Sequence, residues 1–214
     1  MLMREAGYVF EQAEPAFADP AQPEVEEGFA DPAGHAVELA VRKAESLREI
    51  LADHDASLTD ALQMTILISA DTICVGVDGS LIGQPIDADD ARKMIRSFAD
   101  AVHDVVTGVA LLRVQGIARR ITADDLITFA EIVPVTFGAI SDAELDAYIA
   151  TNQWKGKAGG YNLFDRQAAG WPITTPMKCD PTAVVGLPMR KLATALERWG
   201  VKKSMTAGKQ ENRK

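Results

Sequence analysis

The chain has 214 residues, of which 47% are hydrophobic and 25% are charged, and this composition is typical of one globular domain. Its formal net charge of −9 argues against a polyanionic partner, so we expect it to bind no nucleic acid. No uninterrupted run of about 18 apolar residues occurs and the start lacks a signal-peptide layout, so we expect no membrane contact and a cytoplasmic location. Cys74 and Cys179 fit no metal-binding or disulfide pattern.

The first half of the chain predicts a loop, a helix and a hairpin. Residues 13–34 are rich in proline, alanine and acidic residues without any period, which is typical of an exposed loop. From residue 35 to about residue 53, apolar residues recur every three or four positions, which predicts an amphipathic helix with Lys43 near its middle. The apolar run 64–68 predicts a buried strand that ends at residues 69–72. Residues 73–75 and the Asp78-Gly79 turn then predict a hairpin.

The second half predicts alternating strands and helices. Asp87 is a favourable N-cap for a short helix over residues 88–98, and Ser141 with Glu144 forms a capping box that opens a helix through residue 149. Between them, residues 103–112 predict a central strand and residues 125–137 one or two more. A strand at 183–185 and a helix over 188–199 follow. The order predicts an α/β domain over residues 1–201, with a mixed sheet flanked by helices, and a disordered polar tail over 202–214.

Several residues have chemistry that suits a catalytic or anion site, although each also has a simpler structural explanation. Asp71 directly follows a predicted strand, where catalytic carboxylates gather in α/β sheets, or it caps a turn there. Residues 155–161 combine two lysines with three glycines, which suits phosphate binding or a flexible loop, and they are not a Walker loop. Taken alone, Lys43 is typical of a solvated helix face and His103 of a structural histidine.

Nine short motifs in register resemble those of the Maf family and cover about residues 4–200. They are ELAVRKA (38–44), SADT (69–72), DGSLIGQP (78–85), DADDARKMI (87–95), HDVVTGVAL (103–111), VTF (135–137), SDAELDAYI (141–149), KAGGY (157–161) and VVGLP (184–188). The resemblance implies an elongated α/β fold with a nucleotide cleft, like that of the inosine triphosphatases. It also implies a nucleoside triphosphate pyrophosphatase that uses a divalent metal, Mg²⁺ or Mn²⁺, and forms a homodimer.

The resemblance assigns roles to individual residues. It makes Asp71 the proton acceptor that activates water and, together with Asp19, a metal contact. It places Thr72 at a position tied to substrate choice. Lys43 and Lys157 would then face the phosphates from two sides of the cleft.

The chain departs from the family's pattern at several positions. The opening strand and Ser-x-Ser-Pro-Arg-Arg turn of the family are missing, which predicts a weakened phosphate grip and an unpaired sheet edge. The family's Gly-Lys-Pro appears as Gly83-Gln84-Pro85, and its glutamine linked to pyrimidine preference appears as Phe164. We therefore expect Gln84 and Phe164 in the substrate site, and the preferred base stays open.

Two functions compete at this point. The retained Lys43, Asp71, Thr72 and Lys157 favour an active pyrophosphatase. The missing arginines and Gln84 favour a noncatalytic, division-linked regulatory protein that binds nucleotides. An unrelated α/β domain is a third alternative, which the ordered motifs argue against.

Overall fold

The structure, a computed structural model, describes residues 2–17, 31–54, 64–115 and 123–204. Within these ranges five strands form one sheet in the order β2-β1-β3-β4-β5, and every described pair is antiparallel. The strands are β1 (Met64–Val75), β2 (Leu81–Ile82), β3 (Ala101–Gln115), β4 (Leu126–Phe137) and β5 (Ile173–Thr174). The α/β class and the central position of β3 are therefore confirmed, whereas the expected mixed sheet is antiparallel throughout its described pairs.

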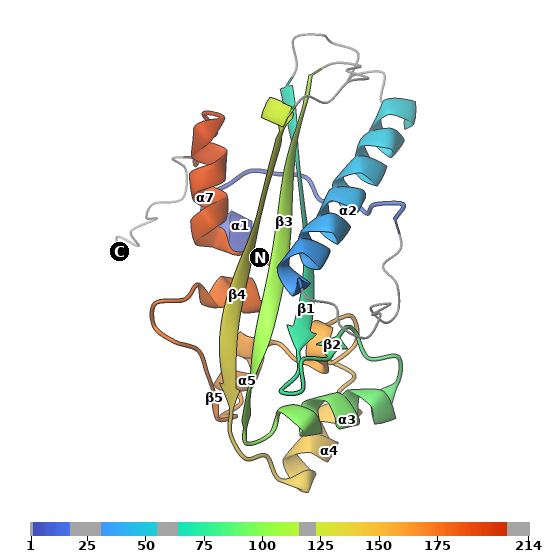
Figure 1. The fold of residues 1–214 in the computed structure, drawn as a ribbon, viewed down its shortest axis with the longest axis vertical. Helices are drawn as coiled ribbons and strands as arrows, with labels where there is room; N and C mark the ends of the chain where they lie inside the picture. Colours follow the sequence, from blue (N-terminus) through green and yellow to red (C-terminus); the bar gives the residue numbers. More distant parts are fainter. Residues whose placement is uncertain (1, 18–30, 55–63, 116–122, 205–214) are drawn as a thin grey trace, which may run out of the picture.

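Helices flank the long strands and close the lower end of the sheet (Figure 1). The α-helices are α1 (Leu2–Glu5), α2 (Pro32–His54), α3 (Ala88–Phe98), α4 (Asp142–Ala150), α5 (Leu163–Ala168), α6 (Pro181–Val184) and α7 (Met189–Arg198). Two short 3₁₀ turns, η2 (Ala123–Asp125) and η3 (Ala158–Gly160), complete the description. None of the helices in the described ranges is long and apolar enough to cross a membrane.

The side-chain alternation of β3 shows which helix covers which face. Ala110 and Leu112 pack in one cluster with Ala40 of α2, whereas Val109 and Leu111 pack with residues of α7. Neighbouring side chains on a strand point to opposite faces, so α2 and α7 lie on opposite sides of the sheet. Figure 1 shows the two helices on either side of the long strands.

The local sequence signals for α3 and α4 are confirmed by their caps. The side chain of Asp87 accepts a hydrogen bond from the backbone nitrogen of Asp90, and the apolar face of α3 is buried. Ser141 and Glu144 cap each other's backbone at the start of α4. Such caps satisfy amides that have no partner inside the helix, so these boundaries are set locally.

One predicted strand is a helix. Residues 183–185 were expected to be extended because valine favours strands, but α6 covers Pro181–Val184. The side chain of Asp180 accepts from the backbone nitrogen of Thr182, and Pro181 occupies the first turn. An aspartate cap followed by proline starts a helix, and here it outweighs the β-branched pair.

Strand β1 is paired over more of its length with β3, on its inner side, than with β2, on its outer side. It pairs with β3 over its whole length, from Met64 to Val75, whereas among the described residues it pairs with β2 only at Cys74 and Val75. The middle of β1 therefore forms an edge of the described sheet. This edge carries the candidate site.

Candidate active site

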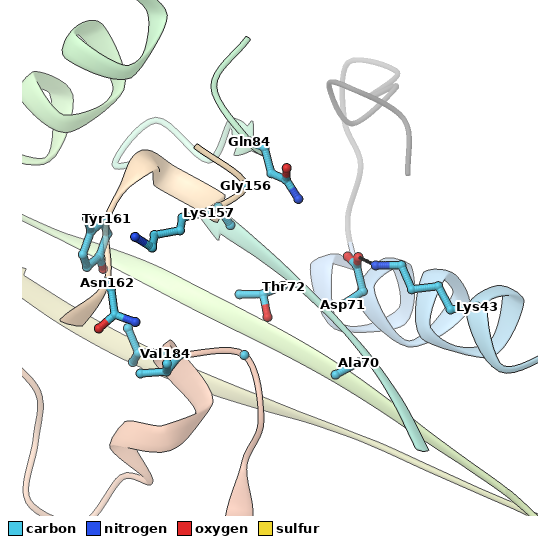
Figure 2. Close-up of a pocket in the computed structure, with 13 residues that line it drawn as sticks. Lys43, Ala70, Asp71, Thr72, Gln84, Gly156, Lys157, Tyr161, Asn162 and Val184 are labelled. Atoms are coloured by element: carbon cyan, nitrogen blue, oxygen red, sulfur yellow. Dashed lines mark hydrogen bonds and ion pairs between the residues drawn. The ribbon is translucent and has the colours of Figure 1, made fainter. Parts of the chain in front are cut away.

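A cavity opens at the edge of β1, between α2, the loop that contains η3, and the turn after α6 (Figure 2). It brings together five of the residues proposed from the sequence: Lys43, Asp71, Thr72, Gln84 and Lys157. The other lining residues are Ala70, Gly156, Ala158, Tyr161, Asn162, Val184, Val185 and Gly186.

Asp71 and Lys43 form an ion pair at one side of this cavity. The Lys43 Nζ donates to Asp71 Oδ1 across 2.7 Å, and the two side chains are only 14% and 8% exposed. An ammonium group beside a buried carboxylate favours its charged form, which is the form that accepts a proton. Figure 2 shows the pair joined across the gap between β1 and α2.

The expected position of Asp71 at a strand end is wrong, because Asp71 lies inside the continuous strand β1. The polar residues around it were read as the end of the strand, but they have partners in neighbouring elements. Ser69 Oγ donates to the carbonyl oxygen of Ala40 in α2 across 2.6 Å. Such tertiary hydrogen bonds allow polar residues to continue a buried strand.

The sheet edge explains how Asp71 and Thr72 reach the same cavity. Adjacent residues of a strand point to opposite faces. Leu67 and Ile73 pack against residues of α2, so Asp71, which has the same parity, points to the α2 face and Thr72 to the other. Both line the cavity because no described strand covers the outer side of β1 at this level.

Gly108 sets how closely α2 approaches this part of the sheet. It lies opposite Asp71 in the register of β1 and β3. A Cβ atom at Gly108 would lie 2.2 Å from the carbonyl carbon of Ala36 and 2.3 Å from the nitrogen of Val37. Any larger residue would push away the helix that carries Lys43, so Gly108 supports the contact between Lys43 and Asp71.

Thr72 belongs to a hydrogen-bonded chain that runs into the protein. Its Oγ1 lies 2.9 Å from Oγ1 of Thr107, the residue opposite it on β3. Thr107 in turn donates to the carbonyl oxygen of Ala183 in α6 across 2.8 Å. The chain ties β1, β3 and α6 together directly beneath the cavity.

The glycine-rich loop brings Lys157 to the opposite side of the cavity. Gly159 has a φ of +66°, and a Cβ atom there would lie 2.8 Å from Cys74 Sγ, so the loop packs where only glycine fits. The backbone nitrogen of Gly159 donates to the carbonyl oxygen of Gly83 across 2.9 Å, which joins the loop to the segment that carries Gln84. Burial lowers the pKa of Lys157, whose Nζ donates to the carbonyl oxygen of Gln153.

His103 packs beneath the glycine-rich loop through Tyr161, and its role as a structural histidine stays a prediction. It is 2% exposed, its ring stacks on Phe98 with 3.9 Å between the centroids, and its Nε2 lies 2.9 Å from the hydroxyl of Tyr161. Tyr161 lines the cavity. Burial lowers the pKa of His103 to about 4 and raises that of Tyr161 well above its ordinary value.

The lowered pKa of His103 predicts a loss of stability in acid. An unfolded histidine titrates near pH 6.5, so between about pH 6.5 and pH 4 the unfolded chain binds a proton that the folded chain does not. Moving from pH 7 to pH 5 should therefore cost about 2 kcal/mol of unfolding free energy through His103. Denaturant titration at both pH values should show this loss in the wild type and not in His103→Gln. Equal losses in the two proteins would contradict the assignment.

Two of the proposed site residues lie elsewhere. Phe164 is on α5 and 39% exposed, and it is not among the residues that line the cavity. Asp19 lies outside the described residues. Their roles stay predictions from the resemblance.

Sequence reasoning assigned no site role to Asn162, and it placed Val184, Val185 and Gly186 only within the VVGLP motif, although all four residues line the cavity. Asn162 is the N-cap of α5, and its Oδ1 accepts from the backbone nitrogen of Asp165 across 3.1 Å. An asparagine at the start of a short helix is a recognisable capping signal. Nothing in the local sequence, however, indicates that Asn162 and the turn after α6 line the same cavity as Thr72.

The described residues provide a partial set of metal ligands. No group of three or more His, Cys, Asp or Glu side chains suited to a metal occurs within them. Asp71 is the described carboxylate that lines the cavity. Mg²⁺ commonly takes one or two protein carboxylates and completes its shell with phosphate oxygens and water, so this donor set fits a cation that arrives with a nucleotide.

The comparisons with known proteins identify the family of the chain. The family model described as Maf-like protein matches residues 1–199. The chain belongs to the Maf family. Maf relatives named dTTP/UTP pyrophosphatase include one from Pyrococcus furiosus, 36% identical over 131 residues that make up 61% of this chain and 62% of that protein. The chain thus spans less than two thirds of this Pyrococcus relative.

Two bacterial Maf relatives with the same name match a longer part of the chain. The protein from Bacillus cereus strain AH187 is 31% identical over 163 residues, which cover 76% of this chain and 73% of the relative. The protein from Bacillus cytotoxicus is 33% identical over 161 residues, which cover 75% and 72%. Both matches exceed two thirds of each chain, so the sequence similarity is not confined to the short motifs.

Proposed function

We propose that this Maf family member hydrolyses a nucleoside triphosphate to the monophosphate and pyrophosphate in the cavity around Asp71. The observation that carries the proposal is the ion pair of Asp71 and Lys43 at a cavity that Lys157 reaches from another element. A noncatalytic nucleotide-binding protein needs cations for the phosphates but has no need of a buried carboxylate beside them. The names of the relatives make UTP and dTTP the first substrates to test.

The charges around the cavity suit the substrate. A triphosphate carries three to four negative charges, and these must be offset before a nucleophile can approach phosphorus. Lys43 and Lys157 supply two cationic groups. Gln84 adds a neutral amide where the family has a lysine. The two lysines and a cation must therefore offset a larger share of the negative charge on the triphosphate.

The proposed cofactor is a divalent cation, Mg²⁺ or Mn²⁺, held by Asp71 and by substrate phosphates. When bound, it would offset phosphate charge and polarise the P–O bond. Asp19 is proposed as its second protein ligand from the resemblance alone. A cytoplasmic location and a homodimer also stay predictions.

The hydrolytic step assigns one role to Asp71. Its carboxylate accepts a proton from water while the water oxygen bonds to the α- or β-phosphorus and the bridging P–O bond breaks. The electron pair of that bond leaves with the departing phosphate group. Lys43 keeps Asp71 charged and oriented for this transfer, and both lysines orient the phosphates.

The test is a nucleotide panel in which pyrophosphate and orthophosphate are both quantified, with Mg²⁺ and then Mn²⁺. We expect one pyrophosphate per monophosphate, with UTP or dTTP among the best substrates. Release of orthophosphate with a nucleoside diphosphate would contradict the proposed bond cleavage. Nucleotide binding without any hydrolysis would support the regulatory alternative instead.

A further inference from the structure

The hydroxyl of Thr107 contacts two oxygen atoms, and these contacts determine which way the hydroxyl proton of Thr72 points. Thr107 is fully buried, and its Oγ1 lies 2.8 Å from the carbonyl oxygen of Ala183 and 2.9 Å from Oγ1 of Thr72. A hydroxyl has one proton to donate, and a carbonyl oxygen has none. The proton of Thr107 must therefore point to Ala183, because two oxygen atoms at 2.8 Å without a proton between them would repel.

The direction of the Thr72 proton follows from this. Thr107 donates its only hydroxyl proton to the carbonyl oxygen of Ala183. The short contact between the two threonines therefore requires the hydroxyl of Thr72 to donate to Oγ1 of Thr107. The Thr72 hydroxyl then presents only lone pairs to the cavity that it lines. A group with lone pairs alone accepts hydrogen bonds and repels phosphate oxygens.

The space in front of the Thr72 hydroxyl is kept open by a glycine. Gly186 has a φ of +99°, and a Cβ atom there would lie 3.4 Å from Thr72 Oγ1. A side chain at this position would be strained and would contact the hydroxyl. The turn after α6 thus leaves the acceptor of Thr72 accessible to a ligand.

We propose that Thr107 is a positioning residue for substrate choice: it turns Thr72 into a pure acceptor that binds an N–H or O–H donor of the nucleoside. This inference rests on the proposed function and extends it to the nucleoside half of the substrate. The donor is the imide N–H of a uracil or thymine ring or a hydroxyl of the sugar. The phosphates bind to Lys43 and Lys157, since the Thr72 hydroxyl has no proton left to donate to a phosphate oxygen.

The experiment compares UTP with three analogues that each lack one donor: 3-methyl-UTP, 2′-deoxy-UTP and 3′-deoxy-UTP. Both kcat/KM for pyrophosphate release and Kd by calorimetry are measured. For the wild type we expect one analogue to fall about tenfold below UTP, the usual effect of losing one hydrogen bond. In Thr72→Val the same analogue should lie within about twofold of UTP, because the acceptor is gone.

Two substitutions of Thr107 separate positioning from packing. Thr107→Val matches the shape of threonine but lacks the hydroxyl, so the Thr72 hydroxyl no longer has to donate to residue 107 and can turn its proton toward the cavity. The ratio of kcat/KM between UTP and the affected analogue should then shrink to about threefold or less. Thr107→Ser keeps the hydroxyl but loses a buried methyl group. It should keep the wild-type ratio between UTP and the analogue even if its melting temperature falls below that of Thr107→Val. A purely structural role predicts that selectivity follows melting temperature instead.

The outcomes decide the proposal. It is overturned if the wild type binds and hydrolyses all three analogues as well as UTP. It is also overturned if Thr107→Val keeps the wild-type difference in kcat/KM between UTP and the affected analogue. Nucleotides that bind without hydrolysis would contradict the proposed function, while the gap in Kd would still decide the role of Thr107. A wild type that binds no nucleotide would overturn both.

Discussion

Replacing Asp71 with asparagine is expected to preserve the fold and remove most of the turnover. The two side chains are nearly isosteric, but an amide cannot accept the proton of the attacking water. A general base commonly contributes a factor of about 10² to 10⁴, so kcat should fall by that order while nucleotide affinity changes much less. Pyrophosphate release and calorimetric Kd, measured on the same preparation, check both parts.

The control for this variant is Asp89→Asn, which makes the same chemical change at an exposed position of α3. Asp89 is not among the residues that line the cavity, so its variant should match the wild type. Wild-type turnover in Asp71→Asn would reject the role of general base. A large fall in melting temperature would show that the carboxylate is needed for structure.

Replacing Lys43 with alanine is expected to weaken nucleotide binding and slow turnover together. The substitution removes a charged phosphate contact, worth about 1.5 to 3 kcal/mol, or roughly a tenfold to 150-fold rise in Kd. It also removes the ammonium group that donates to Asp71, so kcat should fall as well. Lys157→Ala should raise Kd in the same direction but leave kcat closer to that of the wild type.

The matched control is Lys93→Ala, which removes an exposed lysine from α3. It should bind and hydrolyse the nucleotide as the wild type does. Unchanged Kd and kcat in both Lys43→Ala and Lys157→Ala would return these residues to the role of ordinary solvated lysines.

Features whose signals are local could be predicted from the sequence. The cap of Asp87 and the capping box of Ser141 and Glu144 act within four residues, and both helices begin where expected. The apolar period that places Lys43 on a helix is also local, and α2 confirms it. The proposed catalytic and phosphate-binding residues came from the resemblance, since their spacing alone left simpler explanations open.

Features that depend on distant partners could not be predicted. Asp71 was placed at a strand end because its neighbours are polar, and only the contacts with α2 and β3 show why the strand continues through them. The approach of α2 to the sheet depends on Gly108, whose neighbours on that helix, Ala36 and Val37, are more than 70 residues away in sequence. Likewise, Asn162 and Gly186 reach the cavity only through tertiary packing, in which α6 lies against β3 and β4.

The most direct test of the central claim is the crystal structure of Asp71→Asn with UTP and Mg²⁺, because this variant should hold the substrate without cleaving it. The account predicts phosphates between Lys43 and Lys157, and a nucleoside donor at Thr72 Oγ1. A nucleotide bound elsewhere, or one whose phosphates lie far from residue 71, would contradict it.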